Sequence, residues 1–414
     1  MNVEEINNET EAPAKMSFTK TIKLRLYPDA DQIRSFEEMC EEYRKVCNYV
    51  SEYIFNNGFE LRPLKLNKLL YYDIRSKFNL NSQMVQSTFR TVTARYKTLQ
   101  SQLAQKPYKY KDENGKWQYE KRTLEWIEKP IYFARLQADL IHGSNYSLLD
   151  NGTMISLTTL DKRAKMSFEK KHFGSYLNDE WTLGTGKLVR LKKIWYLHIP
   201  VTKNIDAFTK ENVSHIVGID RGLRFLATIY DDHKKTTFIS GKQIAYKRHK
   251  FLETRRQIQS KNTRAAKKVL KRLSGRENRW MSDVNHRISK TLVQTYGPNT
   301  LFVLEDLTGV SFDNINKSKE LNNNIRSWSF YQLEQFLTYK AHENQSEVIK
   351  VKAQYTSQRC PKCGTINKDH RHHDTHEYIC SCGYHSNDDR VGAMNIQLLG
   401  TKWISGEKNP VFEK

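Results

Sequence analysis

Acidic side chains able to bind a divalent metal ion stand at three places in the C-terminal half of the sequence. The apolar run HIVGID ends at Asp220, and a second run, TLFVLED, carries Glu305 near its end. The third acid, Asp389 or its neighbour Asp388, comes before a short helix expected over 391–399. Because an unpaired buried charge is costly, each acid is expected either to be an ordinary turn or strand-end residue or to share a cation. If all three meet, they form an all-oxygen site for Mg²⁺, and two such ions can promote phosphodiester cleavage.

Four cysteines with the spacing of metal ligands lie between the second and third acids. Cys360 and Cys363 form a C-x2-C pair, and Cys380 and Cys382 form a C-x-C pair after a spacer of sixteen residues. A glycine follows each pair and permits a tight turn, as in structural zinc sites. Unrelated cysteines or a redox pair are the alternative. One of the four spacer histidines could also replace a cysteine as ligand: His370, His372, His373 or His376.

The charge of the chain indicates a polyanionic partner. The 414 residues carry a formal net charge of +22. The stretch 242–290, which is expected to be helical, holds sixteen Lys and Arg residues against three acids. A surface of one sign repels itself unless an anion binds to it. We therefore expect this stretch to contact phosphates, with an affinity that depends strongly on salt.

The sequence does not resemble that of a membrane protein. No run approaches the roughly 18 consecutive apolar residues of a membrane span, and the N-terminus lacks a basic-then-apolar signal. Cys40 and Cys47 fall on the apolar stripe of an expected helix and are interpreted as buried thiols, which are typical of a reducing compartment. We expect a cytoplasmic protein that is associated with the nucleoid when it is bound to DNA.

The first half of the chain is expected to combine a small β-barrel with inserted helices. Residues 18–26 alternate apolar and basic side chains, which is typical of a half-buried strand. Short alternating runs separated by turns over 130–202 indicate further strands, which the first strand is expected to join. Three helices are expected between them, over 31–54, 65–78 and 82–102.

The stretch 105–129 is expected to be a loop or hairpin rich in lysine and aromatic residues. Its tyrosines and tryptophans are Tyr108, Tyr110, Trp117, Tyr119 and Trp126. They suit base stacking beside phosphate-binding lysines. The core of a β domain is an equally good interpretation of the same pattern.

The second half is expected to open with an antiparallel meander over 215–240, as a ribonuclease-H-like sheet does. After the basic segment come the strand of Glu305, an amphipathic helix over 328–341 and a strand over 348–353. The polar stretch 308–324 directly follows the Glu305 strand. It is interpreted either as a lid over the acids or as a plain loop.

Four segments, in this order, resemble the nuclease half of the TnpB proteins encoded by transposons and of their relatives, the miniature type V-F CRISPR effectors. The matching segments are GIDRGLRFLAT (218–228), VLEDL (303–307), YTSQRCPKCG (355–364) and CSCGYHSNDDRVGAMNIQ (380–397). The opening IKLRLYPDADQ (22–32) and the helix after it are also similar to the family, so the resemblance spans nearly the whole chain. Two residues depart from the family pattern: Arg221, where an uncharged residue is more common, and Gly392, where Asn is common.

The resemblance implies an α+β multidomain fold, in which a small β-barrel with a helical insertion precedes a RuvC-like, ribonuclease-H-like α/β nuclease domain with an inserted zinc ribbon. The expected parts are a disordered tail (1–16), a wedge-like β-barrel (17–30 and 130–205), a helical recognition insert (31–129), a RuvC-like nuclease (213–355 and 386–404) and a zinc ribbon (356–385).

The family's activity implies an RNA-guided DNA endonuclease that binds a transposon-derived guide RNA and cleaves target DNA. Two catalytic Mg²⁺ ions would be held by Asp220, Glu305 and Asp389, with Asp220 bridging both ions. One structural Zn²⁺ would be held by the four cysteines. Asp389 is preferred to Asp388 because the family's aspartate stands four residues before the alanine of the D-x-x-x-A-x-N-I pattern. An arginine, Arg359 or Arg390, is a candidate to contact the scissile phosphate.

Other functions fit the same residues less well. A miniature type V-F CRISPR effector is the nearest alternative, followed by a cleavage-deficient RNA-guided DNA-binding protein. A DNA-joining transposase would share the acids, but no end-recognition domain is evident in the sequence. The resemblance to TnpB implies a monomer with its RNA, whereas type V-F effectors act as dimers on one guide.

Overall fold

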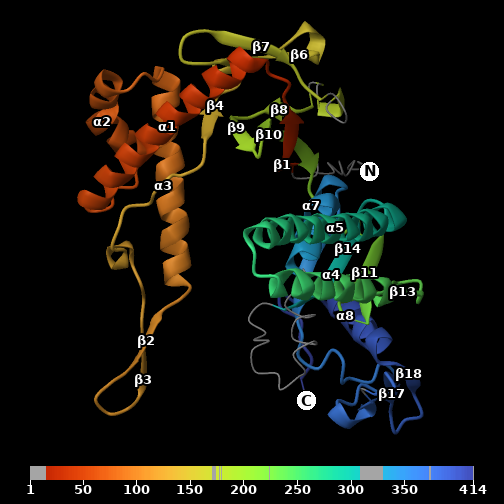
Figure 1. Ribbon diagram of the computed structural model, residues 1–414. Helices are drawn as coiled ribbons and strands as arrows, with labels where there is room; N and C mark the ends of the chain where they lie inside the picture. The colour runs from red at the N-terminus through yellow and green to blue at the C-terminus, as the bar shows by residue number, and fades with distance from the viewer. Residues whose placement is uncertain are drawn as a thin grey trace, which may run out of the picture. The chain divides into compact units, whose positions relative to one another are not determined.

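The computed structural model describes residues 15–169, 174–176, 178, 180–222, 224–307, 330–372 and 374–413. The chain divides into two compact units (Figure 1). One unit is Thr19–Asn204, and the other joins the residues up to Phe18 with those from Ile205 onward. In the described ranges, no helix combines the length and the apolar character that crossing a bilayer requires.

The described part of the first unit contains three sets of paired strands, two of which are sheets of three or more strands. The larger sheet has the order β1-β10-β9-β4, with β8 also paired to β10. A separate sheet has the order β5-β6-β7. The strands of the larger sheet are β1 (Lys15–Arg25), β4 (Gln137–Leu140), β8 (Thr182–Leu183), β9 (Gly186–Leu191) and β10 (Ile194–Asp206). Those of the smaller are β5 (Tyr146–Leu149), β6 (Met154–Thr158) and β7 (Arg163–Ser167).

Alternation along β1 explains how the first strand enters this sheet. Phe18 and Leu24 are buried, whereas Lys23 and Arg25 are exposed. The first strand pairs with β10, more than a hundred residues away, and so joins the later strands as expected. Residues 1–14 of the expected disordered tail lie outside the described residues. Lys15 and Met16, which were assigned to that tail, instead begin β1.

Three helices pack on the sheet of the first unit and share its core. They are α1 (Ala30–Asn56), α2 (Pro63–Lys77) and α3 (Ser82–Ala104). Asp29 caps α1 and Asn81 caps α3 through side-chain hydrogen bonds to the first turn, which fixes where each helix begins. Cys40 and Cys47 are buried in this core as free thiols, and burial raises the pKa of both. A hairpin of β2 (Tyr108–Lys111) and β3 (Trp117–Glu120) follows α3.

The second unit is built on one five-stranded sheet with the order β13-β12-β11-β14-β15. The first three strands form an antiparallel meander, as the sequence predicts, while β14 and β15 run parallel to β11. The strands are β11 (His215–Asp220), β12 (Phe225–Tyr230), β13 (Thr236–Ser240), β14 (Thr300–Asp306) and β15 (Glu347–Lys352).

Helices cover both faces of this sheet because its central strands are apolar on both sides. On one face, Val217, Ile219 and Phe302 share a core with α5 (Arg264–Tyr296) and α7 (Phe330–Glu343). On the other face, Leu301 and Val303 pack with α8 (Asp388–Ile404). The basic segment expected to be one helical stretch is two helices, α4 (Lys242–Ser260) and α5, which lie side by side (Figure 1). The chain reverses at Asn262, which has a positive φ of 41°.

A three-stranded sheet, β16-β17-β18, lies between β15 and α8 in the sequence and includes the cysteine segment's second half. Its strands are β16 (Arg371–His372), β17 (Glu377–Ile379) and β18 (His385–Asn387). The remaining short elements are 3₁₀ turns: η1 (Leu124–Trp126), η2 (Asp150–Gly152), η3 (Gly174–Tyr176) and η5 (Lys368–His370). The expected mixed α+β architecture with several sheets is therefore confirmed. The closure of the first strands into a barrel stays a prediction, and the 308–324 lid or loop lies outside the described residues.

Glycines allow α8 to lie directly on the sheet, and this contact yields a stability prediction. A Cβ on Gly218 of β11 would stand 2.3 Å from the Ala393 carbonyl oxygen and 2.5 Å from the Gln397 nitrogen, both in the backbone of α8. Because backbone atoms cannot swing aside, we expect Gly218→Ala to lower the free energy of unfolding by about 1–3 kcal/mol. A urea titration followed by circular dichroism measures this.

Gly275→Ala in α5 is the matched control. There the nearest atom to the new Cβ is the flexible Arg279 guanidinium at 3.3 Å. A helical Gly→Ala change should then stabilise by about 0.5–1 kcal/mol. Equal effects of the two substitutions would contradict the close approach of α8.

Candidate active site

The pairing of β11 with β14 places two of the three predicted acids next to each other. The parallel register sets Gly218 beside Val303 and Ile219 beside Leu304, so that Asp220 and Glu305 follow at the neighbouring strand ends. Side chains alternate between faces along a strand. Val303 packs toward α8, so Glu305, two residues later, and Asp220 lie on that same face. Adjacent strands are about 4.8 Å apart, which is close enough for both carboxylates to share a cation.

Helix α8 brings the third acid to the same edge of the sheet. Asn387 caps the helix by accepting a hydrogen bond from the Arg390 nitrogen, so Asp389 falls in the first turn rather than ahead of a shorter helix. The Asp220 carboxylate lies against Gly392, three residues further along, because a Cβ there would stand 2.7 Å from Oδ2 of Asp220. The glycine that departs from the family pattern therefore leaves room for this carboxylate. The charges of Glu305 and Asp389 both raise the pKa of Asp220, so the structure places these two acids around Asp220.

The pKa values of the three acids reflect this convergence. Burial raises the pKa of Asp220 well above its usual range, and the neighbouring charges of Glu305 and Asp389 raise it further. Burial likewise raises the pKa of Glu305, whereas a hydrogen bond from the Thr356 hydroxyl lowers it. Burial and the Asp388 charge raise the pKa of Asp389. Like charges held together in a partly desolvated site favour proton uptake or cation binding.

Asp388 has a different role from its neighbour. Its side chain is fully buried, and it accepts a hydrogen bond of 2.9 Å from Nε of Arg371. His376 lies 3.5 Å away on its other side. Asp388 thus joins the start of α8 to the small sheet of the cysteine segment, which leaves Asp389 free to face Asp220.

Arg371 is the functional residue that the sequence did not reveal. Besides its bond to Asp388, its NH2 group lies 3.7 Å from Oδ1 of Asp389, and its charge lowers the pKa of Asp220, Glu305 and Asp389. It comes from β16, inside the cysteine segment. No spacing or periodicity marks it in the sequence, because only the folding of that segment against α8 brings it to the acids.

The two candidate arginines for phosphate contact, Arg359 and Arg390, each have a hydrogen-bond partner within the protein. Arg359 bonds Oδ1 of Asn395 at 3.3 Å, and Arg390 bonds Thr236 at 2.9 Å. Asn395, which is buried, donates in turn to the carbonyl oxygens of Thr356 and Arg359, at 2.8 Å each. This network ties the segment carrying Thr356 to α8 and so orients the hydroxyl that bonds Glu305.

Arg221, the second departure from the family pattern, ties the end of β11 to β14 and α7. Its guanidinium is buried, and it donates to the Glu305 carbonyl at 2.6 Å and to Glu334 of α7 at 3.2 Å. A buried cation requires such a partner, since removing one member of the pair leaves an uncompensated charge. The carboxylate of Glu334 therefore compensates for the unusual arginine, whose charge also lowers the pKa of Glu305.

The four predicted cysteines form one cluster. The sulfurs of Cys360 and Cys382 are 3.6 Å apart, as are those of Cys363 and Cys380, and all four lie within 4.8 Å of one another. Tetrahedral Zn²⁺ with Zn–S bonds of about 2.3 Å would require sulfur separations of about 3.8 Å. Hydrogen bonds with Thr365 lower the pKa of Cys363 to about 6, which favours the thiolate that metals bind.

The spacer histidines that the structure describes lie outside this cluster. His370 is buried and bonds the Tyr378 hydroxyl at 3.1 Å, and His376 contacts Asp388. His372 is in β16, and His373 lies outside the described residues. Gly364 and Gly383 adopt positive φ angles of 79° and 82°. Their backbone nitrogens donate hydrogen bonds to the carbonyl oxygens of Cys360 and Cys380, respectively, as in tight metal-binding turns. Four sulfurs are therefore the donor set among the described residues.

The basic helices α4 and α5 neutralise their own few acids within the pair. Glu277 pairs with Arg255, Asp283 with Arg287, and Glu253 contacts His249. Sixteen Lys and Arg residues against three acids then leave a strong positive charge on these two helices.

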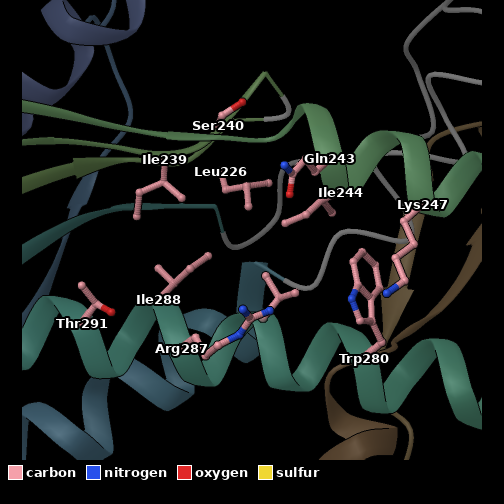
Figure 2. A pocket seen from close by; sticks show the side chains of 11 residues that line it. Leu226, Ile239, Ser240, Gln243, Ile244, Lys247, Trp280, Arg287, Ile288 and Thr291 are labelled. Carbon is pink, nitrogen blue, oxygen red and sulfur yellow. The ribbon is translucent and has the colours of Figure 1, made fainter.

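A pocket of about 740 Å³ lies between these helices and the edge of the sheet. Figure 2 shows its side chains: Leu226 and Ile239 of the sheet face Ile288 of α5, and Lys247 lies beside Trp280. The Lys247 ammonium is 4.8 Å from the centre of a Trp280 ring. An apolar floor with a cation over an aromatic wall is a surface that can receive a nucleobase.

Comparisons with known proteins cover both halves of this site. Residues 198–310 match the family model described as "Probable transposase", and residues 330–396 match "Cas12f1-like, TNB domain". A CRISPR-associated endodeoxyribonuclease Cas12f1 from Sulfoacidibacillus thermotolerans is 24% identical over 81% of this chain and 82% of its own length. The structure of the mini-RNA-guided endonuclease CRISPR-Cas_phi3 shares the fold at 12% identity, with a TM-score of 0.58 over 96% of this chain and 94% of that one.

A third relative decides the family. The TnpB-like protein MJ0751 of Methanocaldococcus jannaschii is 31% identical over 45% of this chain and 69% of its own length. Its match is the most similar in sequence of the three, and the transposase model lies in the half that carries Asp220 and Glu305. The chain belongs to the TnpB family.

Proposed function

We propose that this protein is an RNA-guided DNA endonuclease, which binds a transposon-derived guide RNA and cleaves the DNA that pairs with it. The observation that carries the proposal is the convergence of Asp220, Glu305 and Asp389, from two strands and a helix, at one edge of the sheet. Residues 213–355 and 386–404 would form the RuvC-like nuclease around this edge. The relatives named as RNA-guided or DNA-cleaving enzymes support the choice of substrate.

The three acids fit a pair of Mg²⁺ ions. The donor set is all oxygen, as Mg²⁺ prefers, and the charges of Glu305 and Asp389 beside the buried Asp220 favour a bound cation. Bound Mg²⁺ would supply an activated water and neutralise charge on the phosphate. Asp220, between the other two acids, would hold both ions, and Glu305 and Asp389 one each.

Protein groups around the acids would orient the carboxylates and favour their ionised form. Thr356 orients the Glu305 carboxylate, and the N-terminus of α8 favours the ionised form of Asp389. Arg371 lies against the acids and would also contact the scissile phosphate. The Cys360, Cys363, Cys380 and Cys382 cluster would hold one structural Zn²⁺ and so fix the segment that carries Arg371.

The surface of α4 and α5 would bind the nucleic acid. Its excess positive charge can release counterions from several phosphates, which gives affinity without reading a sequence. Base pairing with the guide would then select the target. In the family, the strands and helices of residues 17–205 hold the guide–target duplex, and we propose the same role for them here.

Asp220→Asn tests the catalytic proposal. Cleavage of a guide-matched DNA should fall by on the order of 10³-fold or more, because the bridging carboxylate is lost. Without metal, the variant should be more stable than the wild type by about 1 kcal/mol, since a buried like charge is removed. The rise in melting temperature that Mg²⁺ gives the wild type should disappear.

Asp161→Asn, the same charge change at an exposed position, is the matched control. It should retain cleavage and the Mg²⁺-dependent rise in melting temperature. A fully active Asp220→Asn variant would refute the proposed site.

Zinc content tests the cysteine cluster. Mass spectrometry of the purified protein should find one zinc per chain, and Cys363→Ser should lose most of it because a tetrahedral site needs four donors. Cys40→Ser, at a buried thiol outside the cluster, should keep its zinc. Retention of zinc by both variants would show that the metal lies elsewhere.

Salt titrations test the basic helices. Replacing the exposed Lys267, Lys268 and Lys271 by Gln should reduce the slope of log Kd against log salt by up to about 3 for a short RNA–DNA duplex. The control replaces the exposed Lys234, Lys235 and Lys408, outside residues 17–205 and the two basic helices, in the same way. An equal or larger change in the control would place the main phosphate contacts outside α4 and α5.

A further inference from the structure

The β2–β3 hairpin exposes aromatic side chains that have no core to pack against. Every residue of both strands is exposed, and the hairpin pairs with no further strand among the described residues. Figure 1 shows it beyond the C-terminal end of α3, away from the other helices of its unit. An isolated two-stranded hairpin gains little stability of its own, so aromatic side chains there require another explanation than core packing.

The register divides the hairpin into two faces. Lys109 is paired with Tyr119, and Lys111 with Trp117, so these four residues share one face, here called the lysine–aromatic face. The ring of Trp117 is 59% exposed and that of Tyr119 is 61% exposed. Each lysine ammonium lies 5.3 Å from the centre of the ring opposite. Both rings are therefore open to solvent, with a cation beside each.

On the opposite face of the hairpin, the aromatic rings contact one another. Tyr108 stacks on Tyr110 with centroids 5.9 Å apart, and it also contacts Trp126 at 5.5 Å. These contacts join the hairpin to the chain that follows it. Trp117 and Tyr119, by contrast, have lysines rather than rings as their cross-strand neighbours. Contacts between rings thus explain the aromatic residues of one face. The aromatic residues of the lysine–aromatic face have no such apolar partner across the strands.

The turn holds the lysine–aromatic face in a fixed shape. The Asp112 carboxylate accepts hydrogen bonds from the backbone nitrogens of Asn114 and Lys116, at 3.0 and 2.8 Å, and from the Gln118 side chain at 2.8 Å. The Gln118 hydrogen bond is the main cause that lowers the pKa of Asp112. Gly115 supplies the positive φ, 74°, that closes the turn. A rigid platform loses less entropy on binding than a flexible loop.

We propose that the lysine–aromatic face stacks unpaired bases of the RNA that accompanies this protein. Residues 117 and 119 are separated by about 6.8 Å along the strand, roughly twice the 3.4 Å rise of stacked bases. One base therefore fits between the two rings. The lysines beside the rings are placed to neutralise the flanking phosphates, the combination that binds single strands without regard to sequence.

The choice of RNA rests on the proposed RNA-guided function. A guide RNA offers unpaired loop bases whenever the complex exists, whereas target DNA has unpaired bases only after it is opened. Open rings on a lone hairpin also favour aggregation unless a lasting partner covers them. A guide RNA meets that requirement, and its phosphates complement the two lysines.

Ultraviolet crosslinking of the full chain purified with its cellular RNA tests this proposal. Peptide mass spectrometry should find nucleotides attached to Trp117 or Tyr119. Trp117→Ala with Tyr119→Ala should abolish that crosslink and weaken binding of a labelled oligouridine by roughly 10- to 100-fold. Trp117→Phe with Tyr119→Phe keeps the rings and should bind within about 3-fold of the wild type.

Tyr331→Ala is the matched control, since Tyr331 on α7 is also highly exposed and lies outside residues 17–205. It should leave oligouridine binding unchanged. Circular dichroism melts check that each variant is folded. The readout is binding, so it does not depend on whether Asp220 and its neighbours cleave DNA. Absence of hairpin crosslinks from a complex that crosslinks elsewhere would overturn the proposal, as would unchanged affinity of the double alanine variant. Tighter binding of oligothymidine than of oligouridine would overturn the assignment to RNA.

Discussion

Repulsion between carboxylates that the backbone holds together is the constraint on which the rest of the second unit depends. The parallel register of β11 and β14 sets Asp220 beside Glu305, and the first turn of α8 adds Asp389. Each side chain alone would be an ordinary strand-end or helix-start acid. The charges of Glu305 and Asp389 add to burial in raising the pKa of Asp220, whereas burial and the Asp388 charge raise that of Asp389. Sites of this kind are stabilised by the cation that they bind.

This arrangement depends on glycines, which let α8 pack directly against the sheet. Gly218 lets the backbone of α8 touch β11, Gly400 accommodates Val303, and Gly392 leaves space for the Asp220 carboxylate. A helix held further from the sheet would carry Asp389 away with it. The same contact places Asn395 where it can bond the segment of Thr356, so the geometry of all three acids derives from one helix position.

The cysteine segment contacts the candidate active site and is also a separate small fold. Asp388 and Arg371 join it to the start of α8, and Arg371 is the nearby cation that lowers the pKa of the acids. Disorder of the four-cysteine cluster would therefore also displace the carboxylates, because Asp388 and Arg371 connect the two. The first unit contributes differently, through a rigid hairpin and helices whose exposed cations and rings suit nucleic acid.

The sequence by itself determined the local features: which runs are strands and helices, where two acids follow apolar runs and a third precedes a helix, which cysteines are paired and where positive charge accumulates. These depend on periodicity, composition and spacing, which neighbouring residues set. Only the tertiary structure decided that Asp388 is buried against Arg371, and that Arg371, from the cysteine segment, lies beside the acids. It also decided that the aromatic residues of the hairpin are exposed. Such outcomes depend on strand register and on the approach of one helix to a sheet, and these are fixed by contacts between residues far apart in the chain.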